Sequence, residues 1–173
     1  MREEKQIQLI ADGDENALRS LIERYYPEIL RYCQWHAPNI SYAEDAAQES
    51  FLKAIHYVRR NSFRGNFRAF LYQIARNTCL DMKKSSWNSL TYIEDIENEP
   101  LASSNAMDEI ERREVIHSAL LTMTEEEQEL VHLRFDSNLK LREIAAILNL
   151  PVRTVQSRLR KALKELEPHL KGV

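Results

Sequence analysis

The sequence predicts an all-α protein made of two small helical domains joined by a flexible acidic linker. With only 3 Gly and 5 Pro among 173 residues, the chain lacks the turn residues that a sandwich or barrel needs. Ala, Leu, Glu, Arg and Lys are abundant, and these residues favour helices. The length suits one ordinary domain or two small ones. The charges are divided among three zones, which indicates two modules and a connection between them.

The first two helices are predicted from polar start signals and apolar spacing. A short helix is expected over Glu3–Ala11. Asp12 and Glu15 have the spacing of a capping box, which predicts a second helix that runs to about Trp35. Pro27 interrupts this run, and a proline inside a helix can kink it.

Two further helices and a loop complete the first half. Ser41 and Glu44 form a second capping-box pattern, which predicts a helix to about Val58. Residues 61–66 (NSFRGN) are typical of a loop, and Phe67–Lys84 is expected to be helical. The residues expected to face inward from this last helix are Phe70, Leu71, Ile74, Ala75 and Leu80.

The segment 86–107 separates the halves. It lacks sustained helical periodicity and contains Pro100, so it is interpreted as a linker. Ser86–Glu111 carries seven acids and no Lys or Arg, whereas Arg59–Lys84 and Lys140–Lys164 each carry seven basic residues and one acid. The formal net charge of −3 therefore hides two basic patches on either side of an acidic stretch.

The second half is predicted to hold four helices. Thr124 and Glu127 form a third capping-box pattern, and Pro151 suits the first turn of the last helix because its missing N–H is not needed there. The expected elements are 108–121, 124 to about 135, 141–148 and a last helix from Pro151. A short helix, a tight turn and a second helix together predict a helix-turn-helix.

The last helix is expected to have two distinct faces. Its apolar stripe consists of Val155, Leu159, Ala162, Leu163 and Leu166. Its polar stripe, without any acid, consists of Arg153, Gln156, Ser157, Arg160, Lys161 and Lys164. Because surface faces normally mix signs, a face of one sign at a helix N-terminus favours contact with DNA phosphates and base edges. Arg158 lies on neither stripe and is expected at most to contact a phosphate.

The stretch LREIAAILNLPVRTVQSRLRKALKEL resembles region 4 of bacterial sigma factors, especially the small extracytoplasmic-function (ECF) group. The resemblance rests on Glu143-Ile-Ala and on Thr154-Val-Gln-Ser-Arg158. It implies that this helix reads the promoter −35 element. The expected contacts are Arg153, Thr154, Gln156, Ser157, Arg160 and Lys161. Gln156 replaces a residue that is often basic in the family, and Gln pairs well with adenine, so a shifted −35 preference is expected.

The stretch YAEDAAQESFLKAIHYVRRNSFRGNFRAFLYQIARNTCLDMKK resembles region 2 of the same family. The resemblance implies that the helix carrying Asp45, Gln48, Glu49 and Leu52 docks on the clamp helices of the polymerase β′ subunit. By spacing alone, these four residues share one helix face, although acids at a helix start also simply favour the helix dipole. The expected −10 contacts are Phe63, Arg64, Gly65, Asn66, Tyr72, Arg76, Asn77, Lys83 and Lys84, and Arg68 is expected to follow the DNA backbone with them. Asn77 matches the position that helps to hold the flipped base.

The expected function is therefore that of a sigma factor that directs core RNA polymerase to promoters. The expected domains are region 2 over 1–85, the linker over 86–107 and region 4 over 108–173. The resemblance implies three partners: core polymerase (β′ clamp helices and β flap), promoter DNA and an anti-sigma factor. Two alternatives remain open: a stand-alone helix-turn-helix regulator and a helical adaptor that does not bind DNA.

Several classes of function are not expected. The sequence shows no grouping of nucleophile and base, no phosphate-binding Gly loop and no metal set, so neither an enzyme nor a cofactor is predicted. Cys33 and His36 alone make no structural metal site. No apolar run approaches the ~20 residues that span a membrane, and no signal peptide is evident. A cytoplasmic protein with Cys33 and Cys79 reduced is expected.

Overall fold

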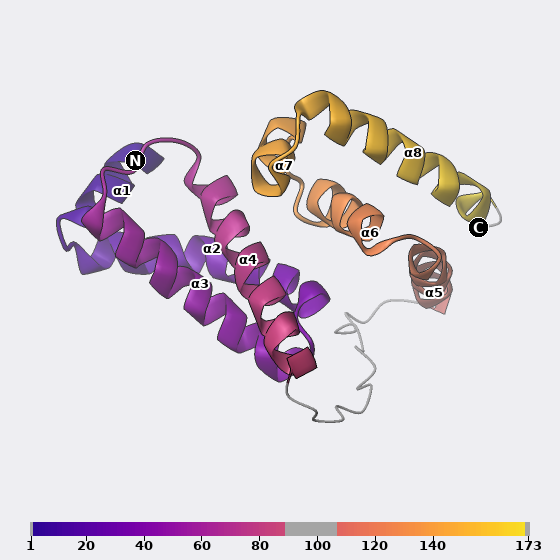
Figure 1. The fold of residues 1–173 in the computed structure, drawn as a ribbon, viewed down its shortest axis with the longest axis horizontal. Helices are drawn as coiled ribbons and strands as arrows, with labels where there is room; N and C mark the ends of the chain where they lie inside the picture. The colour runs from indigo at the N-terminus through magenta and orange to yellow at the C-terminus, as the bar shows by residue number, and fades with distance from the viewer. Residues whose placement is uncertain (1, 89–106, 172–173) are drawn as a thin grey trace. The chain divides into compact units, whose positions relative to one another are not determined.

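The computed structural model describes residues 2–88 and 107–171, and every regular element among them is a helix, as the all-α prediction requires. The chain divides into two compact units, and the fold is shown in Figure 1. The helices α1–α4 form the first unit, and α5–α8 form the second. Of the expected linker, residues 89–106 lie outside the described part of the chain.

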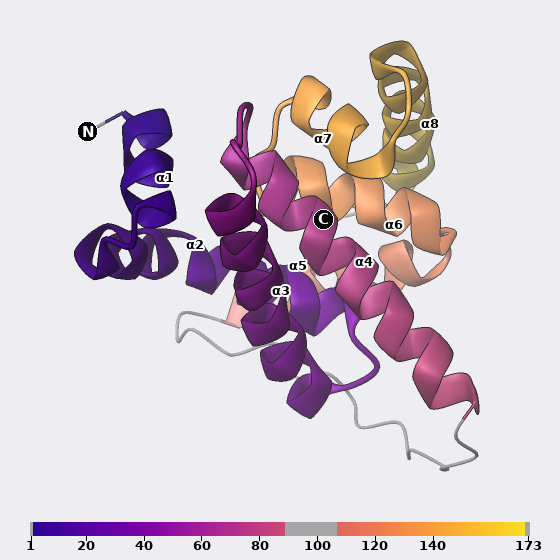
Figure 2. The same cartoon turned by 60° about the vertical axis from the view of Figure 1, so that its left-hand side comes forward.

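The first unit packs three long helices and one short one around a single core. Its elements are α1 (Glu3–Ala11), α2 (Glu15–His36), α3 (Ile40–Arg60) and α4 (Phe67–Asn88). The three long helices each contact the other two, and α1 packs on α2 and α3, as Figures 1 and 2 show from two sides. Fully buried side chains from α1, α2 and α4, including Ile10, Leu21, Ile29 and Leu71, fill the space between them.

The starts of two helices differ from the sequence prediction. The carboxylate of Asp14, and not that of Asp12, caps α2 by accepting the Ala17 N–H at 2.9 Å. The side chain of Asn39, and not that of Ser41, caps α3 by accepting the Tyr42 N–H at 3.0 Å. Several polar residues precede each helix, and only the one whose backbone is extended directly before the first turn can act as the cap.

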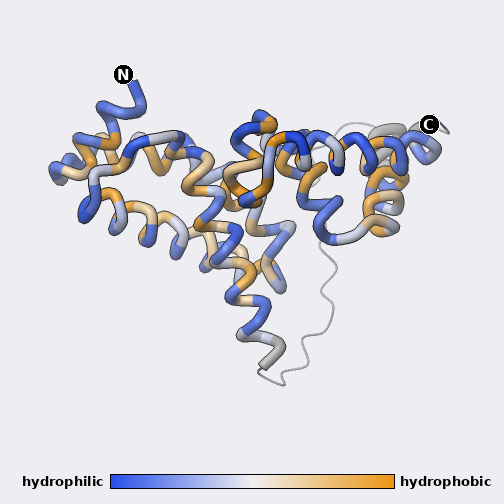
Figure 3. Tube along the Cα trace, turned by 45° about the horizontal axis from the view of Figure 1, so that its top comes forward, coloured by the Kyte–Doolittle hydropathy of each residue, from blue (hydrophilic) through white to orange (hydrophobic). Residues whose placement is uncertain are grey.

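The second unit is a small bundle organised by its last helix. Its elements are α5 (Met107–Leu121), α6 (Glu125–Val131), α7 (Leu141–Leu148) and α8 (Val152–Leu170). The helix α8 packs against α5, α6 and α7. Figure 3 shows that hydrophilic and hydrophobic stretches alternate along the helices, which is the pattern of amphipathic helices packed on one side. The capping box predicted at Thr124 and Glu127 is present.

Two predictions about the helices need correction. The chain from His132 to Asp136 (η1) has π-helical hydrogen bonding, which the sequence pattern did not indicate. Leu163 and Leu80 are 39% and 38% exposed, because both lie at the edge of their apolar stripes and not at its centre. Pro27 lies within α2, which continues to His36.

Candidate nucleic-acid interface

The turn between α7 and α8 brings the two helices of the second unit into a helix-turn-helix. Asn149 ends α7 in the left-handed conformation (φ 53°, ψ 47°), and its N–H donates to the Ala145 carbonyl. The Leu150 N–H donates to the same carbonyl at 3.0 Å. Pro151 then precedes the first turn of α8, and its carbonyl accepts the N–H groups of Thr154 and Val155. Only three residues therefore separate the helices.

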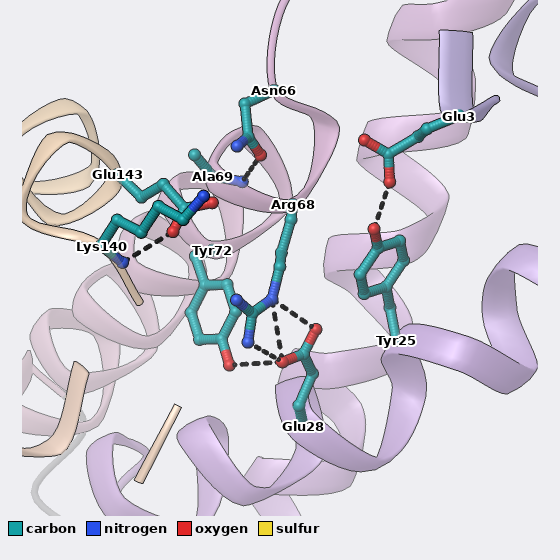
Figure 4. A network of polar contacts seen from close by, with 9 residues as sticks. All are labelled: Glu3, Tyr25, Glu28, Asn66, Arg68, Ala69, Tyr72, Lys140 and Glu143. Atoms are coloured by element: carbon teal, nitrogen blue, oxygen red, sulfur yellow. Dashed lines mark hydrogen bonds and ion pairs between the residues drawn. The ribbon is translucent and has the colours of Figure 1, made fainter. Parts of the chain in front are cut away.

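At its start, α7 is fixed by a hydrogen bond from the backbone before it to a side chain of its first turn. The Lys140 N–H donates to the Glu143 carboxylate at 2.7 Å, as Figure 4 shows. Ile144 and Ile147 are buried on the inner side of α7. A short helix anchored at both ends in this way holds the start of α8 in place.

The outward face of α8 carries the residues predicted to read the −35 element. Beneath it, Val155, Leu159, Ala162 and Leu166 are buried, so the apolar stripe anchors the helix. Thr154 is half-buried, and the exposed residues of the face are Arg153, Gln156, Ser157, Arg160, Lys161 and Lys164. The six predicted contact residues thus lie on the first turns of a single helix and leave no acid among them.

Two basic residues of α8 have partners on α6. The Lys161 Nζ lies 3.2 Å from the Glu127 Oε1, and the Arg158 Nη1 lies 3.2 Å from the Glu126 Oε2. Hydrogen bonds from the Thr124 backbone and from Lys161 lower the pKa of Glu127, and the Glu127 hydrogen bond raises the pKa of Lys161. No sequence pattern predicts these contacts, because they join residues more than thirty positions apart.

In the first unit, the loop between α3 and α4 is held by aromatic packing. The Phe63 ring packs on Phe67 and Phe70, with ring centroids 5.8 and 4.9 Å apart. Gly65 has φ +127°, a conformation that L side chains rarely adopt. The Asn66 side-chain oxygen accepts the Ala69 N–H at 2.9 Å and so caps α4 (Figure 4), a structural role that the sequence analysis did not assign. Arg64 is exposed beside them.

A surface cavity of about 260 Å³, largely open to solvent, lies between α3 and α4, next to Asn77. Its lining residues are Lys53, Tyr57, Phe70, Ile74, Asn77 and Thr78. Asn77 is exposed, and the Lys53 Nζ donates to the Thr78 hydroxyl at 3.3 Å. Lys53 and Tyr57 were not predicted from the sequence, because they come from α3, and only the packing of α3 on α4 brings them to Asn77.

Tyr72 and Arg68 are held by contacts within the first unit. Tyr72 is fully buried, its ring packs edge-on against Tyr32, and its hydroxyl donates to Glu28 at 3.2 Å. The Arg68 guanidinium holds the same Glu28 carboxylate at 2.6 Å, as Figure 4 shows. The prediction that Tyr72 contacts DNA is therefore wrong for this conformation, since a ring within the core cannot stack on a base. Both side chains instead join α4 to α2.

The remaining basic residues of α4 lie on either side of Asn77. Arg76 and Lys83 are half-buried, and Lys84 is exposed. Arg76 precedes Asn77, and Lys83 and Lys84 lie about two turns beyond it on the same helix, so a strand that leaves the cavity along α4 would meet positive charge.

The acidic face predicted on α3 is also present. Asp45, Gln48 and Leu52 are exposed, Leu52 to 69%, and Glu49 is half-buried. Ala43, Ala46, Ala47 and Phe51 are buried on the opposite side. The Glu49 carboxylate forms an ion pair with Lys53 at 2.7 Å. An exposed leucine ringed by acids and an amide is suited to a partner helix that carries arginine.

The two cysteines form a buried pair in the first unit. Cys33 on α2 and Cys79 on α4 are both buried and not joined by a disulfide. The hydrogen bond with Cys79 and burial together raise the pKa of the Cys33 thiol. Within the described residues, no group of three His, Cys, Asp or Glu side chains is arranged to hold a metal ion.

The modules match known families. Residues 21–89 match Sigma-70 region 2, and residues 113–166 match Sigma-70, region 4. The chain belongs to the ECF group of RNA polymerase sigma factors. The two matches cover the loop and cavity of the first unit and the helix-turn-helix of the second, in the order in which the sequence analysis expected them.

Curated relatives of this sigma factor are similar to it in sequence over nearly the whole chain. The ECF RNA polymerase sigma factor SigW of Bacillus subtilis (strain 168) is 29% identical over 98% of this chain and 97% of its own length. The ECF RNA polymerase sigma-E factor of Escherichia coli (strain K12) is 29% identical over 93% and 90%. The chain therefore directs transcription initiation as a sigma factor, and its relatives are initiation factors and not known enzymes.

Solved structures show the same fold. CnrH, in complex with the cytosolic domain of CnrY, has a TM-score of 0.72 at 20% identity, over 98% of this chain and 97% of that chain. The sigma factor RpoE of Bartonella quintana, in complex with the anti-sigma factor NepR, has a TM-score of 0.70 at 22% identity, over 88% of this chain and 96% of that chain.

In the described part of the present chain, no helix combines the length and the apolar character that a membrane span requires.

Proposed function

We propose that this sigma factor reads the −35 element with the outward face of α8. The observation that carries this proposal is the exposed face without acids, anchored on a buried apolar stripe in the second helix of a helix-turn-helix. Arg153, Thr154 and Arg160 are suited to phosphates, and Gln156 and Ser157 to base edges. Lys161 extends the positive charge along the groove. Gln156 favours adenine at the position it reads.

We further propose that the cavity beside Asn77 holds a base of the melted −10 element. The amide of Asn77 has donors and an acceptor for a Watson–Crick edge, and the rings of Tyr57 and Phe70 offer surfaces for stacking. The cavity is open to solvent, so a flipped base would lie against its wall and not be enclosed by it. Phe63, Arg64, Gly65 and Asn66 form the adjoining loop. Arg76, Lys83 and Lys84 would then follow the single-strand phosphates.

The proposed surface for core polymerase is the face of Asp45, Gln48, Glu49 and Leu52. The exposed Leu52 supplies an apolar centre, and the neighbouring carboxylates supply acceptors for arginine. We assign residues 1–85 to region 2, 86–107 to the linker and 108–173 to region 4, with region 4 contacting the β flap. This division leaves each proposed DNA surface within one helical unit.

Three further assignments belong to this proposal. The CnrH and RpoE structures contain partner proteins, and RpoE is bound to an anti-sigma factor, so we propose that an anti-sigma factor also controls this chain. We place the protein in the cytoplasm, where its polymerase partner acts. We assign it no catalytic activity of its own, since its chemistry consists of binding and opening DNA.

Run-off transcription with reconstituted core polymerase and a randomised promoter library tests the function directly. The expected result is enrichment of paired −35 and −10 motifs. Absence of any paired motif would exclude this reading of both sites. Replacement of four residues of the outward face with acids is expected to abolish −35-dependent transcription; these residues are Gln156, Ser157, Arg160 and Lys161. Replacement of the exposed Lys5 on α1 with an acid is expected to leave this transcription unchanged.

A further inference from the structure

The contact between Lys161 and Glu127 joins the proposed DNA face to a carboxylate on a different helix. The Lys161 Nζ lies 3.2 Å from the Glu127 Oε1 and 3.7 Å from Glu165. The Lys161 side chain is 69% exposed, whereas that of Glu127 is only 12% exposed. The lysine is therefore accessible to DNA, while the acid beneath it is not free to turn away.

Glu127 is fixed by the cap of α6. Its Oε2 accepts the Thr124 N–H and the Thr124 hydroxyl, both at 3.1 Å, and the Glu127 N–H donates back to that hydroxyl at 3.3 Å. One oxygen serves the cap, and the other accepts from Lys161. A carboxylate immobilised in this way loses little further side-chain entropy when it pairs with the ammonium, which removes one of the costs that weaken surface ion pairs.

The neighbouring acids are matched comparisons. Glu126 pairs with Arg158 at 3.2 Å, but its side chain is 77% exposed and no cap holds it. Glu125 is exposed in the same first turn and forms no ion pair with a described residue. Of these three acids, only Glu127 is both held by the cap and in contact with the outward face of α8.

We propose that Glu127 is a specificity-determining residue, which competes with DNA phosphates for the Lys161 ammonium and so limits binding to DNA without a −35 element. This inference rests on the proposed function of α8. Non-specific binding depends almost entirely on neutralised phosphates, whereas specific binding also uses base contacts. If the Lys161 ammonium is held by Glu127, non-specific binding is therefore weakened by a larger fraction than specific binding.

The test compares Glu127→Gln with Glu125→Gln in holoenzyme assembled from the full chain and core polymerase. Glutamine at this position keeps an oxygen for the Thr124 N–H and so preserves the capping box, whereas the charge and the acceptor that face Lys161 are lost. The probes are a duplex with a −35 element selected from the promoter library and the same duplex with that element scrambled. Binding is measured by fluorescence anisotropy at several salt concentrations between 50 and 200 mM.

Glu127→Gln is expected to steepen the slope of log K against log salt by up to about 0.9 on the scrambled duplex, which is the value of one phosphate. Between 50 and 200 mM salt, the loss of affinity for the scrambled duplex should then be about three- to four-fold larger for this variant than for the parent chain. The ratio of specific to non-specific affinity should fall. Glu125→Gln changes the net charge equally and is expected to leave the slope unchanged.

A double-mutant cycle with Lys161→Gln assigns the effect to the pair. In that background, Glu127→Gln should no longer differ from Glu125→Gln. The inference is overturned if Glu127→Gln behaves like Glu125→Gln, or if its effect survives the loss of Lys161. If Lys161→Gln and Arg160→Gln leave −35 binding unchanged, then the proposed function of α8 is itself wrong.

Discussion

Arg68 of α4 and Glu28 of α2 form a fork-to-carboxylate ion pair, with the Arg68 Nη2 2.6 Å and the Arg68 Nε 3.0 Å from the carboxylate. The Tyr72 hydroxyl donates to the same carboxylate, so one acid holds two side chains of the neighbouring helix. Bidentate pairing fixes direction as well as distance. The pair therefore sets the position of the first turns of α4, directly after the loop that carries Phe63 and Gly65.

Glu28→Gln is expected to destabilise the first unit. The charge that holds Arg68 is lost, and because both side chains are about a quarter exposed, solvent screening limits the effect to about 1–2 kcal/mol. Urea denaturation of the full chain, followed by circular dichroism, measures this change. Glu23→Gln removes an exposed acid from the same helix and is expected to have no effect. Equal midpoints for the two variants would exclude a structural role for the pair.

At position 149, a substitution by glycine is expected to be tolerated and one by a β-branched residue is not. Its φ of 53° is left-handed, and this conformation costs L residues without a short polar side chain roughly 1–2 kcal/mol. Asn149→Val should lower the unfolding temperature of the second unit, whereas Asn149→Gly should leave it nearly unchanged. Differential scanning calorimetry of the two variants distinguishes these outcomes. Equal losses of stability would mean that the side chain, and not the backbone, matters.

Gly65→Ala is expected to impair promoter opening while leaving −35 binding intact. A Cβ at Gly65 would meet no atom within 4 Å, so the effect comes only from backbone strain at φ +127°, of about 1–3 kcal/mol. Relaxing this strain should change the conformation of the loop, which contacts the cavity through the packing of Phe63 on Phe70. Permanganate footprinting of the open complex measures melting, with Ser62→Ala as the control in the same exposed loop. Full melting by Gly65→Ala would argue against a role for the loop geometry.

Tyr25 is expected to make the first unit sensitive to alkaline pH. Burial, followed by its hydrogen bond to Glu3, raises the pKa of Tyr25 from 10.0 to about 12 (Figure 4 shows the contact). Because the pKa of the folded state is the higher one, this stabilisation is complete below pH 10 and is lost as the pH rises toward 12. The stability difference between the parent chain and Tyr25→Phe should shrink over this range. With Tyr26→Phe as the comparison, a constant difference would contradict the assignment.

Much of this protein could be predicted from local patterns. The 3.6-residue spacing of Val155, Leu159, Ala162 and Leu166 placed the buried stripe of α8, and their burial confirms it. The bounds of α1 and α7 were predicted correctly because their apolar residues and end signals coincide. The caps Asp14 and Asn39 were not, since several acceptors precede each helix and the backbone selects one. The −35 and polymerase contacts remain predictions.

The sequence by itself determined the all-α class, the two modules and the face of α8 that carries positive charge, because these depend on spacing within one helix. Tertiary structure decided which side chains from different helices meet. It buried Tyr72 against Tyr32, brought Lys53 and Tyr57 to Asn77, and placed Glu127 beneath Lys161. Helix periodicity fixes the direction of a side chain around its own axis, but its partners depend on how the helices pack.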